Sequence, residues 1–567
     1  MFRLFRTSAL LAVTALTAAS FAASTAGQGT IAQGGKTLPA ANPSPCLSLS
    51  AGSKVLEPQD LYSSGGKLVV NASYYTGLDR NGATQFCFVT PEGYVNPTMH
   101  VKPGDLFTMN LTNRVPVGTI METVKTSCGE SVVLDSSLNL HFHGTLVSPA
   151  CQSDDVVDTV INSGDTFQFN IKVPTDEPPG LYWYHPHLHG IAENALLGGG
   201  SGAFVVDGIE NFQTSTAGLP ARVLVMRDSN TVGAALPPGA TDAFGKIVPT
   251  WDISLNNVPV NYVAGVTSPA PVIEMKAGQP ELWRVVNASA DSVLDFQVLY
   301  DGKAQPLSVV SFDGVPIGSQ NVVNLGLLSL TLGTAQPVSK TTIPMSPGSR
   351  VEFMLAPPAA GVKTAVMQTQ TIVTGPAGDS DPSRTLAQIV TSRTGTTLPV
   401  IPAAKGAWLQ RFVGLDNAPV SVNRKLYFSE VISNPADPSS PTNFFVTVDG
   451  AVPKVFAMGQ APAITTNNGV VEEWTIENRS PELHVFHIHQ IHFKLEQVNG
   501  KNVSASDAQF YDDYQIPAWS GTGPYPSIKV KMDFRSPTIV GDFVYHCHIL
   551  GHEDNGMMAI IRVLPHP

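Results

Sequence analysis

The chain has 567 residues, enough for about three domains if one domain averages roughly 150 residues. Its formal net charge is −12 and it contains no basic block, which argues against a nucleic-acid-binding protein. Only 14% of residues are charged, and glycine (49) and proline (45) interrupt short apolar runs throughout. Because these runs lack long helical periodicity, we predict an all-β protein.

The N-terminal segment has the features of a secretory signal. Residues 1–26 carry two arginines, then an apolar run, then small residues. That run is too short and wrongly flanked for a membrane span, and no other apolar run is long enough. We therefore expect a cleaved signal peptide and a secreted or periplasmic mature protein without a membrane span. Five Asn-x-Ser/Thr sequons could carry glycans in a eukaryotic secretory pathway: Asn71, Asn110, Asn287, Asn478 and Asn502.

Four of the five cysteines lie in the first third of the chain, and an exported protein can keep disulfides. Four cysteines allow three pairings. We favour Cys46–Cys87 and Cys128–Cys151, the second of which would close the loop around the first histidine pair. The fifth, Cys547, is then left over, as a metal thiolate would be.

A short phrase recurs along the chain: an apolar residue, a turn with glycine, and an alternating strand that ends near asparagine or proline. The copies span 101–113, 160–170, 273–287, 343–355 and 464–478. Such repetition is typical of a duplicated Greek-key sandwich. We predict domains at 40–207, 208–395 and 396–567, the second ending in polar loops at 375–383 and 391–397. The second has no histidine, so any shared metal site must join the first and third.

Four histidine motifs stand out between residues 141 and 548. In a strand, residues i and i+2 share a face, so each His-x-His pair can serve one metal or two adjacent metals. In the last motif Cys547 points away from its two neighbours, and His552 and Met557 follow shortly. Cysteine with two histidines and a weak axial methionine is the ligand set of a blue-copper site. The motifs are His141-Phe-His143, His185-Pro-His187, His484-Val-Phe-His487-Ile-His489 and His546-Cys-His548.

With these motifs in this order, the chain resembles the multicopper oxidases of the laccase type, which consist of three tandem cupredoxin-like Greek-key β-sandwich domains. The phrase Tyr182-Trp-Tyr-His-Pro-His-Leu-His-Gly190 is nearest in texture to bacterial members. The resemblance implies four coppers per chain. It assigns a type 1 copper to His484, Cys547 and His552 with axial Met557, a type 2 copper to His141 and His487, and a type 3 pair to His143, His185, His187, His489, His546 and His548.

The resemblance also implies an activity. A small-molecule reductant would give single electrons at the type 1 site, and these would pass through Cys547 and its neighbours to the three-copper cluster, where dioxygen becomes water. Phenols and aromatic amines are the expected reductants. Oxidation of cuprous, ferrous or manganous ions is the alternative, although no Met-rich loop is present. A non-catalytic copper-binding cupredoxin protein is the alternative of another class, and would be expected to have lost cluster ligands. We expect a monomer.

Reducing dioxygen also requires protons. The resemblance places Asp154 and Asp155 near the water channel to the cluster, and Glu553 matches a glutamate of some bacterial members. These three are our candidate proton-relay residues; each could instead be a solvated loop acid or a hydrogen-bond partner of a ligand. We expect His189 and His492 outside the metal sites, whereas His100 and His566 carry no signal.

Overall fold

The computed structural model describes residues 45–79, 82–230, 250–260, 269–319, 335–403, 409–434 and 441–566, with residues 31–33, 36–38, 241, 248, 322–324 and 329–331. The expected signal peptide at 1–26 lies outside the described residues. Strand makes up 46% of the structure and helix 5%, so the all-β prediction is confirmed. No helix in the described ranges is long and apolar enough to cross a membrane.

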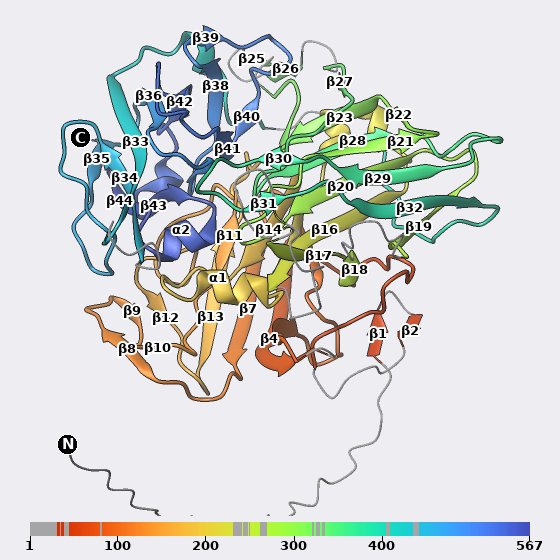
Figure 1. Ribbon diagram of the computed structural model, residues 1–567, viewed down its shortest axis with the longest axis horizontal. Coiled ribbons are helices and arrows are strands. Elements are labelled where there is room, and N and C mark those ends of the chain that lie inside the picture. Colours follow the sequence, from red (N-terminus) through yellow and green to blue (C-terminus); the bar gives the residue numbers. More distant parts are fainter. Residues whose placement is uncertain are drawn as a thin grey trace, which may run out of the picture.

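Six larger sheets among the described residues form three face-to-face pairs, each around its own apolar core. In Figure 1 the first pair (red to orange) lies below, the second (yellow to green) on the right and the third (cyan to blue) at the upper left. The strands of each pair come from one of the three predicted segments, which confirms three tandem β-sandwiches. The boundary residues themselves stay a prediction.

The first domain pairs a five-stranded with a four-stranded sheet. Alternation along β4 shows why it forms: Leu68, Val70, Ala72 and Tyr74 point into the core and their neighbours do not. The sheets are, in spatial order, β11 (His141–His143), β14 (Gly180–His185), β15 (Gly202–Val206), β6 (Thr98–Val101), β3 (Asp60–Tyr62); and β13 (Thr166–Lys172), β7 (Leu106–Asn113), β4 (Lys67–Leu78), β5 (Thr84–Val89). Small pairs are β1 (Ile31–Gln33) with β2 (Lys36–Leu38), β8 (Ile120–Thr123) with β10 (Val132–Leu134), and β9 (Cys128–Gly129) with β12 (Thr159–Val160).

The second domain is built on the same plan. Its sheets are β18 (Val258–Val260), β17 (Trp251–Leu255), β16 (Ala221–Asn230), β20 (Glu281–Asn287), β28 (Arg350–Leu355), β23 (Leu307–Phe312), β24 (Val315–Pro316), with β27 (Val338–Lys340) on β23; and β19 (Val272–Lys276), β32 (Thr385–Ser392), β29 (Ala365–Thr369), β21 (Phe296–Tyr300), β22 (Lys303–Ala304). Small pairs are β25 (Val322–Asn324) with β26 (Ser329–Thr331) and β30 (Ile372–Val373) with β31 (Ser380–Asp381). The predicted loops at 375–383 and 391–397 are therefore partly strand.

The third domain carries the C-terminal strands. Its sheets are β34 (Thr442–Val448), β33 (Val422–Ile432), β36 (Val471–Asn478), β42 (Ser527–Asp533), β38 (Phe493–Val498), β39 (Lys501–Asn502), with β40 (Phe510–Tyr511) on β38; and β35 (Ile464–Asn467), β44 (Met558–Leu564), β43 (Gly541–Cys547), β37 (His484–Ile488), β41 (Asp513–Ile516). The helices in the described part of the chain are short: α1 (Ala192–Leu197), α2 (Leu550–Asp554), η1 (Ile209–Asn211), η2 (Thr214–Thr216), η3 (Leu415–Asn417) and η4 (Pro537–Ile539).

An asparagine closes the corresponding strand in each domain, which explains the phrase repeated in the sequence. Asn113, Asn287 and Asn478 are the last residues of β7, β20 and β36, and all three are fully buried. Each Nδ2 donates to two or more backbone carbonyls, at least one of them remote in sequence, and each Oδ1 accepts from the backbone N–H two residues further on. The sequons at Asn287 and Asn478 therefore cannot accept glycans in the folded protein.

Both favoured disulfides are present, Cys46–Cys87 and Cys128–Cys151. Cys547 is the free cysteine of the described chain and is buried. The expectation that it stands apart from the disulfides is confirmed.

The segment around α2 is held by the other two domains. The Asp554 carboxylate accepts from the backbone N–H groups of Gly190 (2.6 Å) and Glu193 (2.9 Å) at α1 in the first domain. From the second domain, Asp291 Oδ1 accepts from Gly551 N at 2.9 Å. These hydrogen bonds fix the chain between His548 and Met557 against neighbours that are remote in sequence.

Candidate metal centre

Strand register brings the histidine motifs together. In the first domain β11 pairs with β14 so that His141 lies opposite His185. In the third domain β37 pairs with β43 so that His487 lies opposite His546. Because side chains that share a face in register are close neighbours, each sheet presents a patch of imidazoles. The two patches face each other across the boundary between the domains.

Contacts across that boundary are close. His187 Nε2 lies 3.1 Å from His546 Nε2, which is itself 3.3 Å from His489 Nε2. The rings of His141 and His489 stack with centroids 3.7 Å apart. All eight histidines of the four pairs are at most 2% exposed. The structure thus joins the first and third domains in one buried cluster, as a shared site requires.

The eight rings divide into subsets that could each hold a metal ion. His187, His489 and His546 form one compact triplet. His143, His185 and His548 form a second, with ring centroids 4.9–5.8 Å apart. His141 and His487 remain, with centroids 6.0 Å apart. Other compact groups also occur, such as His141 with His143 and His185, so the assignment to a type 2 site and a type 3 pair stays a prediction.

In five of these rings one nitrogen is held by an oxygen atom. Nδ1 of His185, His487 and His546 faces a backbone carbonyl at 2.9 Å, Nδ1 of His141 faces Asp154 at 3.0 Å, and Nε2 of His143 faces Asp513 Oδ2 at 2.8 Å. Such bonds fix the tautomer and orientation of metal-binding histidines. Burial lowers the pKa of every ring in the cluster, so the imidazoles are neutral and able to ligate.

The opposite nitrogens have no hydrogen-bond partner among the described residues: Nε2 of His141, His185 and His487, Nδ1 of His143, and both nitrogens of His548. Leaving a buried polar atom unpaired is costly, on the order of 1–3 kcal/mol each. Several such atoms in one place are explained if they bind metal. The residues present therefore fit a copper cluster.

Sequence reasoning missed an acidic network behind the cluster. Asp512 accepts two hydrogen bonds from Arg350, at 2.6 and 2.5 Å, and lies 3.1 Å from His492 Nε2. Although burial acts to raise it, Arg350 holds the pKa of Asp512 well below its usual range. The neighbouring Asp513 lies opposite His487 across β37 and β41. Only strand register reveals this, because no local motif marks the pair. His492 is fully buried in this network, outside the histidine cluster, and His189 packs on Phe456.

The three candidate proton-relay residues differ in position. Asp154 contacts His141 and also accepts from Phe142 N (2.8 Å) and Gln490 Nε2 (2.5 Å), and burial raises its pKa to about 8. Asp155 accepts instead from the backbone N–H of Asp158 at 2.9 Å. Glu553 is fully buried, and neither of its oxygens has a hydrogen-bond partner in the described chain.

A second site lies on the other face of β43. Cys547 Sγ lies 3.5 Å from His484 Nδ1 and 3.7 Å from His552 Nδ1, and these two nitrogens are 3.1 Å apart. Met557 is fully buried in the same core cluster, and its carbonyl accepts from Cys547 N at 3.0 Å. A thiolate with two imidazoles suits copper better than a harder ion. The expected type 1 residues are thus brought together.

The outer edges of this second site are polar. His484 Nε2 lies 2.7 Å from Ser480 Oγ, and His552 Nε2 lies 3.3 Å from Glu482 Oε1. Phe444 stacks on the His552 ring with centroids 4.3 Å apart. Ser480 and Glu482 were also missed by sequence reasoning, although both lie within four residues of His484.

Comparison with sequence families gives two matches, one in the first domain and one in the third. Residues 131–211 and residues 435–567 each match a family model described as multicopper oxidase. The two matched regions contain all four histidine motifs together with Cys547, His552 and Met557.

Among curated proteins, a multicopper oxidase of Staphylococcus aureus is 36% identical over 96 residues, which is 16% of this chain and 20% of that protein. Longer matches are weaker: the multicopper oxidase LPR1 of Arabidopsis thaliana is 23% identical over 75% of each chain, and Laccase-1 of Pleurotus ostreatus is 21% identical over 81% of this chain and 80% of its own. The chain thus spans only a fifth of the first of these relatives.

Solved structures share the fold. A multicopper oxidase from Campylobacter jejuni, described as a metallo-oxidase, superposes with a TM-score of 0.62 at 20% identity, covering 91% of this chain and 96% of that one. A variant of McoA from Aquifex aeolicus gives 0.61 at 17% identity, covering 90% and 99%. Both are three-domain cupredoxin-fold proteins, so the predicted fold class is confirmed.

Proposed function

Because the chain belongs to the multicopper oxidase family, we propose that it is a laccase-like oxidase that couples one-electron oxidation of a reductant to reduction of dioxygen to water. The observation that carries this proposal is the cluster of eight buried histidines, contributed by two domains, directly behind the Cys547 site. A protein that only stores or carries one copper ion has no need of that cluster.

The proposed ligands are those assigned from the sequence. His484, Cys547 and His552, with Met557, would hold one copper; His141 and His487 a second; and the two histidine triplets a pair. When bound, copper would supply one-electron redox chemistry: the reductant would give electrons singly at the first site, and the four coppers together would pass the four electrons that dioxygen needs. The protein contributes geometry, exclusion of water and control of protons.

Connection between the sites is covalent. Cys547 faces one site, while His546 and His548, the residues on either side, belong to the other. Val485 N donates to Cys547 Sγ at 3.4 Å, which helps to hold the sulfur in place. The thiolate and its two peptide neighbours therefore offer the shortest bonded path for electrons between the sites.

Proton supply is assigned to Asp154 and Glu553. Asp154 holds Nδ1 of His141 and bonds to Gln490 of the third domain, so it bridges the two halves of the cluster. Burial raises the pKa of Glu553 well above its usual range, which favours the protonated form of this group. A protonated carboxylic acid in a dry site is able to act as a general acid. Asp155 is the weaker candidate because its carboxylate caps a turn.

For the reductant we favour phenols and aromatic amines. Loss of an electron makes a phenol strongly acidic, so its oxidation requires a proton acceptor close to the electron entry point. Glu482, at 3.3 Å from the outer nitrogen of His552, is such an acceptor. Phe444 provides an aromatic surface beside the same ring.

Oxidation of a metal ion is the second candidate. Glu430 forms a side-chain hydrogen bond with Glu482, so two carboxyl groups lie together beside His552. Carboxylates attract cations, and the Campylobacter jejuni relative is described as a metallo-oxidase. A phenol needs Glu482 as a proton acceptor, whereas a metal ion needs it as a negative charge. A variant of Glu482 can therefore distinguish the two candidate reductants.

The test uses copper-loaded protein and measures oxygen uptake with 2,6-dimethoxyphenol, Fe(II), Cu(I), Mn(II) and ferrocyanide. If phenols are the substrates, Glu482→Gln lowers kcat/KM for the phenol about tenfold or more and leaves ferrocyanide, which releases no proton, unchanged. Glu92→Gln, in an exposed turn, is the control. Fastest uptake with one of the three metal ions would replace the phenol proposal, and no uptake with any reductant would leave only a non-catalytic copper protein.

We also propose that the protein is exported, on the basis of residues 1–26. N-terminal sequencing of the protein recovered outside the cytoplasm should give a start shortly after residue 26. An intact Met1 would contradict the proposal.

A further inference from the structure

A cavity of about 400 Å³ lies away from both candidate metal sites, where the first two domains meet the connection to the third. Its walls come from β3, β6, β16 and β20, from the segment 207–211 that follows β15 and includes η1, and from residues 399–402. Backbone hydrogen bonds from Gly218 and Ala221 to Ile401 and Pro399 hold the last segment in place. A volume of this size is typical of sites for small organic ligands.

One wall of the cavity contains a buried arginine whose guanidinium is only partly paired. Arg284 is 2% exposed. Its Nε lies 3.0 Å from Glu352 Oε1, but the two atoms are not aligned for a hydrogen bond. Among the described residues nothing accepts a hydrogen bond from its Nη1 and Nη2 atoms, although the residue lines the cavity. A guanidinium has five N–H donors in a planar fork. Here most of that capacity is unused.

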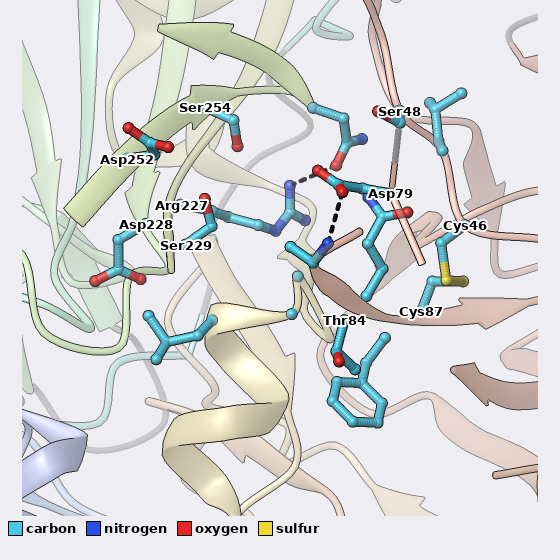
Figure 2. Close-up of a pocket in the computed structure, with 18 of the residues that line it drawn as sticks. Cys46, Ser48, Asp79, Thr84, Cys87, Arg227, Asp228, Ser229, Asp252 and Ser254 are labelled. Carbon is cyan, nitrogen blue, oxygen red and sulfur yellow. Dashed lines mark hydrogen bonds between the residues drawn. A yellow bond between two sulfur atoms is a disulfide. The ribbon is translucent and has the colours of Figure 1, made fainter. Parts of the chain in front are cut away.

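Three other buried arginines of the protein have side-chain hydrogen-bond acceptors. Arg222 bonds to Glu57 and Glu281, and Arg350 bonds to Asp512. Arg227 lines a smaller hollow of about 150 Å³ between the first two domains, shown in Figure 2. Its Nε and Nη2 donate to Ser201 at 2.8 and 2.6 Å, and its Nη1 donates to Asn257 Oδ1 at 3.4 Å. Arg284 differs from all three.

The remaining charges of the cavity favour an anion. Lys102 is exposed at the rim, and no described residue pairs with its ammonium group. His100 has both ring nitrogens at carboxylates, Asp207 at 3.0 Å and Asp60 at 3.3 Å, so Asp207 is engaged by the ring. Glu210, the other acidic residue of the lining, also interacts with another residue. The two groups without a full set of partners are both cations.

The other walls are apolar or flat. Pro399, Val400, Ile401 and Pro402 line one side, with Val400 61% exposed at the opening. On the other side the Tyr62 ring stacks on His100 with centroids 4.3 Å apart. An inorganic anion would leave these surfaces unused, whereas an aromatic acid would cover them and place its carboxylate on the Arg284 fork.

We propose that this cavity binds an aromatic carboxylate, with the carboxylate on Arg284 and the ring between Tyr62 and the Pro399–Pro402 segment. Such a site lies outside the electron-transfer machinery, and its existence does not depend on the proposed oxidase activity.

The probe is 2-naphthoate, which has no phenolic hydroxyl to oxidise, titrated calorimetrically into the copper-loaded full chain; 2-naphthamide is the uncharged control. We expect one naphthoate per chain with Kd near or below about 1 mM and at least tenfold weaker binding of the amide. Arg284→Gln should weaken naphthoate binding about tenfold or more and leave the visible copper band unchanged. Equal affinity for acid and amide, or wild-type affinity in Arg284→Gln, would overturn the proposal.

A second pair of variants covers the case in which Arg284→Gln does not fold. Val400→Glu places a negative charge at the opening on an exposed position, and Val400→Gln adds the same bulk without charge. Naphthoate should bind several-fold more weakly to the glutamate variant than to the glutamine variant, and the difference should shrink at high salt. Equal binding to both variants, or binding that perturbs the copper band instead, would place the ligand elsewhere and overturn the proposal.

Discussion

The Nε2 atoms of His187 and His546 lie 3.1 Å apart although 359 positions separate the two residues in the chain. His187 belongs to the first domain and His546 to the third, so neither domain contains the cluster by itself. A site of this kind depends on how two sandwiches dock, and the contacts of α2 with α1 and Asp291 maintain that docking.

Cys547→Ser should remove the intense visible absorption of the copper-loaded protein and block entry of electrons from the reductant. A serine hydroxyl is a harder and weaker donor than a thiolate, so the copper of that site is lost or altered. Absorption spectra and oxygen uptake measure both effects. Full activity in this variant would disprove the proposed electron path.

Asp154→Asn should lower turnover or copper content of the cluster by about 10- to 100-fold, because the carboxylate orients His141. The matched variant Asp155→Asn changes a neighbouring acid that holds only a turn, and should have a much smaller effect. Copper analysis and oxygen uptake distinguish the two. If Asp155→Asn proved the more damaging, the assignment of the relay to Asp154 would be wrong.

Glu553→Gln should slow reduction of dioxygen about 100-fold while leaving anaerobic bleaching of the visible band by the reductant nearly unchanged. The glutamine fills the same space in the buried position but cannot give up a proton. Glu553→Asp keeps the acid and should recover part of the rate. Equal slowing of both half-reactions would point to damage at His552 rather than to loss of a proton donor.

His100 makes the stability of the first domain depend on pH. Although burial acts to lower it, the hydrogen bonds to Asp207 and Asp60 raise the pKa of His100 above 6.5. The folded state then binds the proton more tightly than the unfolded state, so the stabilisation is complete below about pH 6.5 and is lost as pH rises through the raised pKa.

We therefore expect the Tm to fall further between pH 6 and pH 9 in the wild type than in His100→Gln. The two decreases in Tm should differ by roughly 2 °C. His566→Gln, at an exposed position, is the control. Parallel Tm profiles for wild type and His100→Gln would show that the two carboxylates do not hold the proton.

The fold class and the histidine motifs that gather in the cluster could both be predicted from the sequence. The reason is that the patterns that reveal them are local. Strand alternation, glycine turns and His-x-His spacing act over a few residues, and all four pairs are found in one cluster. The recurring phrase that ended near asparagine corresponds to Asn113, Asn287 and Asn478, each closing an equivalent strand.

Residues that act through register were not predictable in the same way. Asp513 reaches His143 because β41 pairs with β37, and Arg350 comes from a domain that has no histidine. His100 carried no signal because its partners, Asp60 and Asp207, meet it only through β3 and β15 on either side of β6. Such contacts need the sheet order, which local spacing does not contain.

The central claim, a four-electron oxidase, is tested most directly by copper analysis combined with the ratio of reductant oxidised to dioxygen consumed. The account predicts about four coppers per chain and four one-electron equivalents per dioxygen, without release of hydrogen peroxide. One copper per chain, or two equivalents per dioxygen with peroxide released, would contradict it.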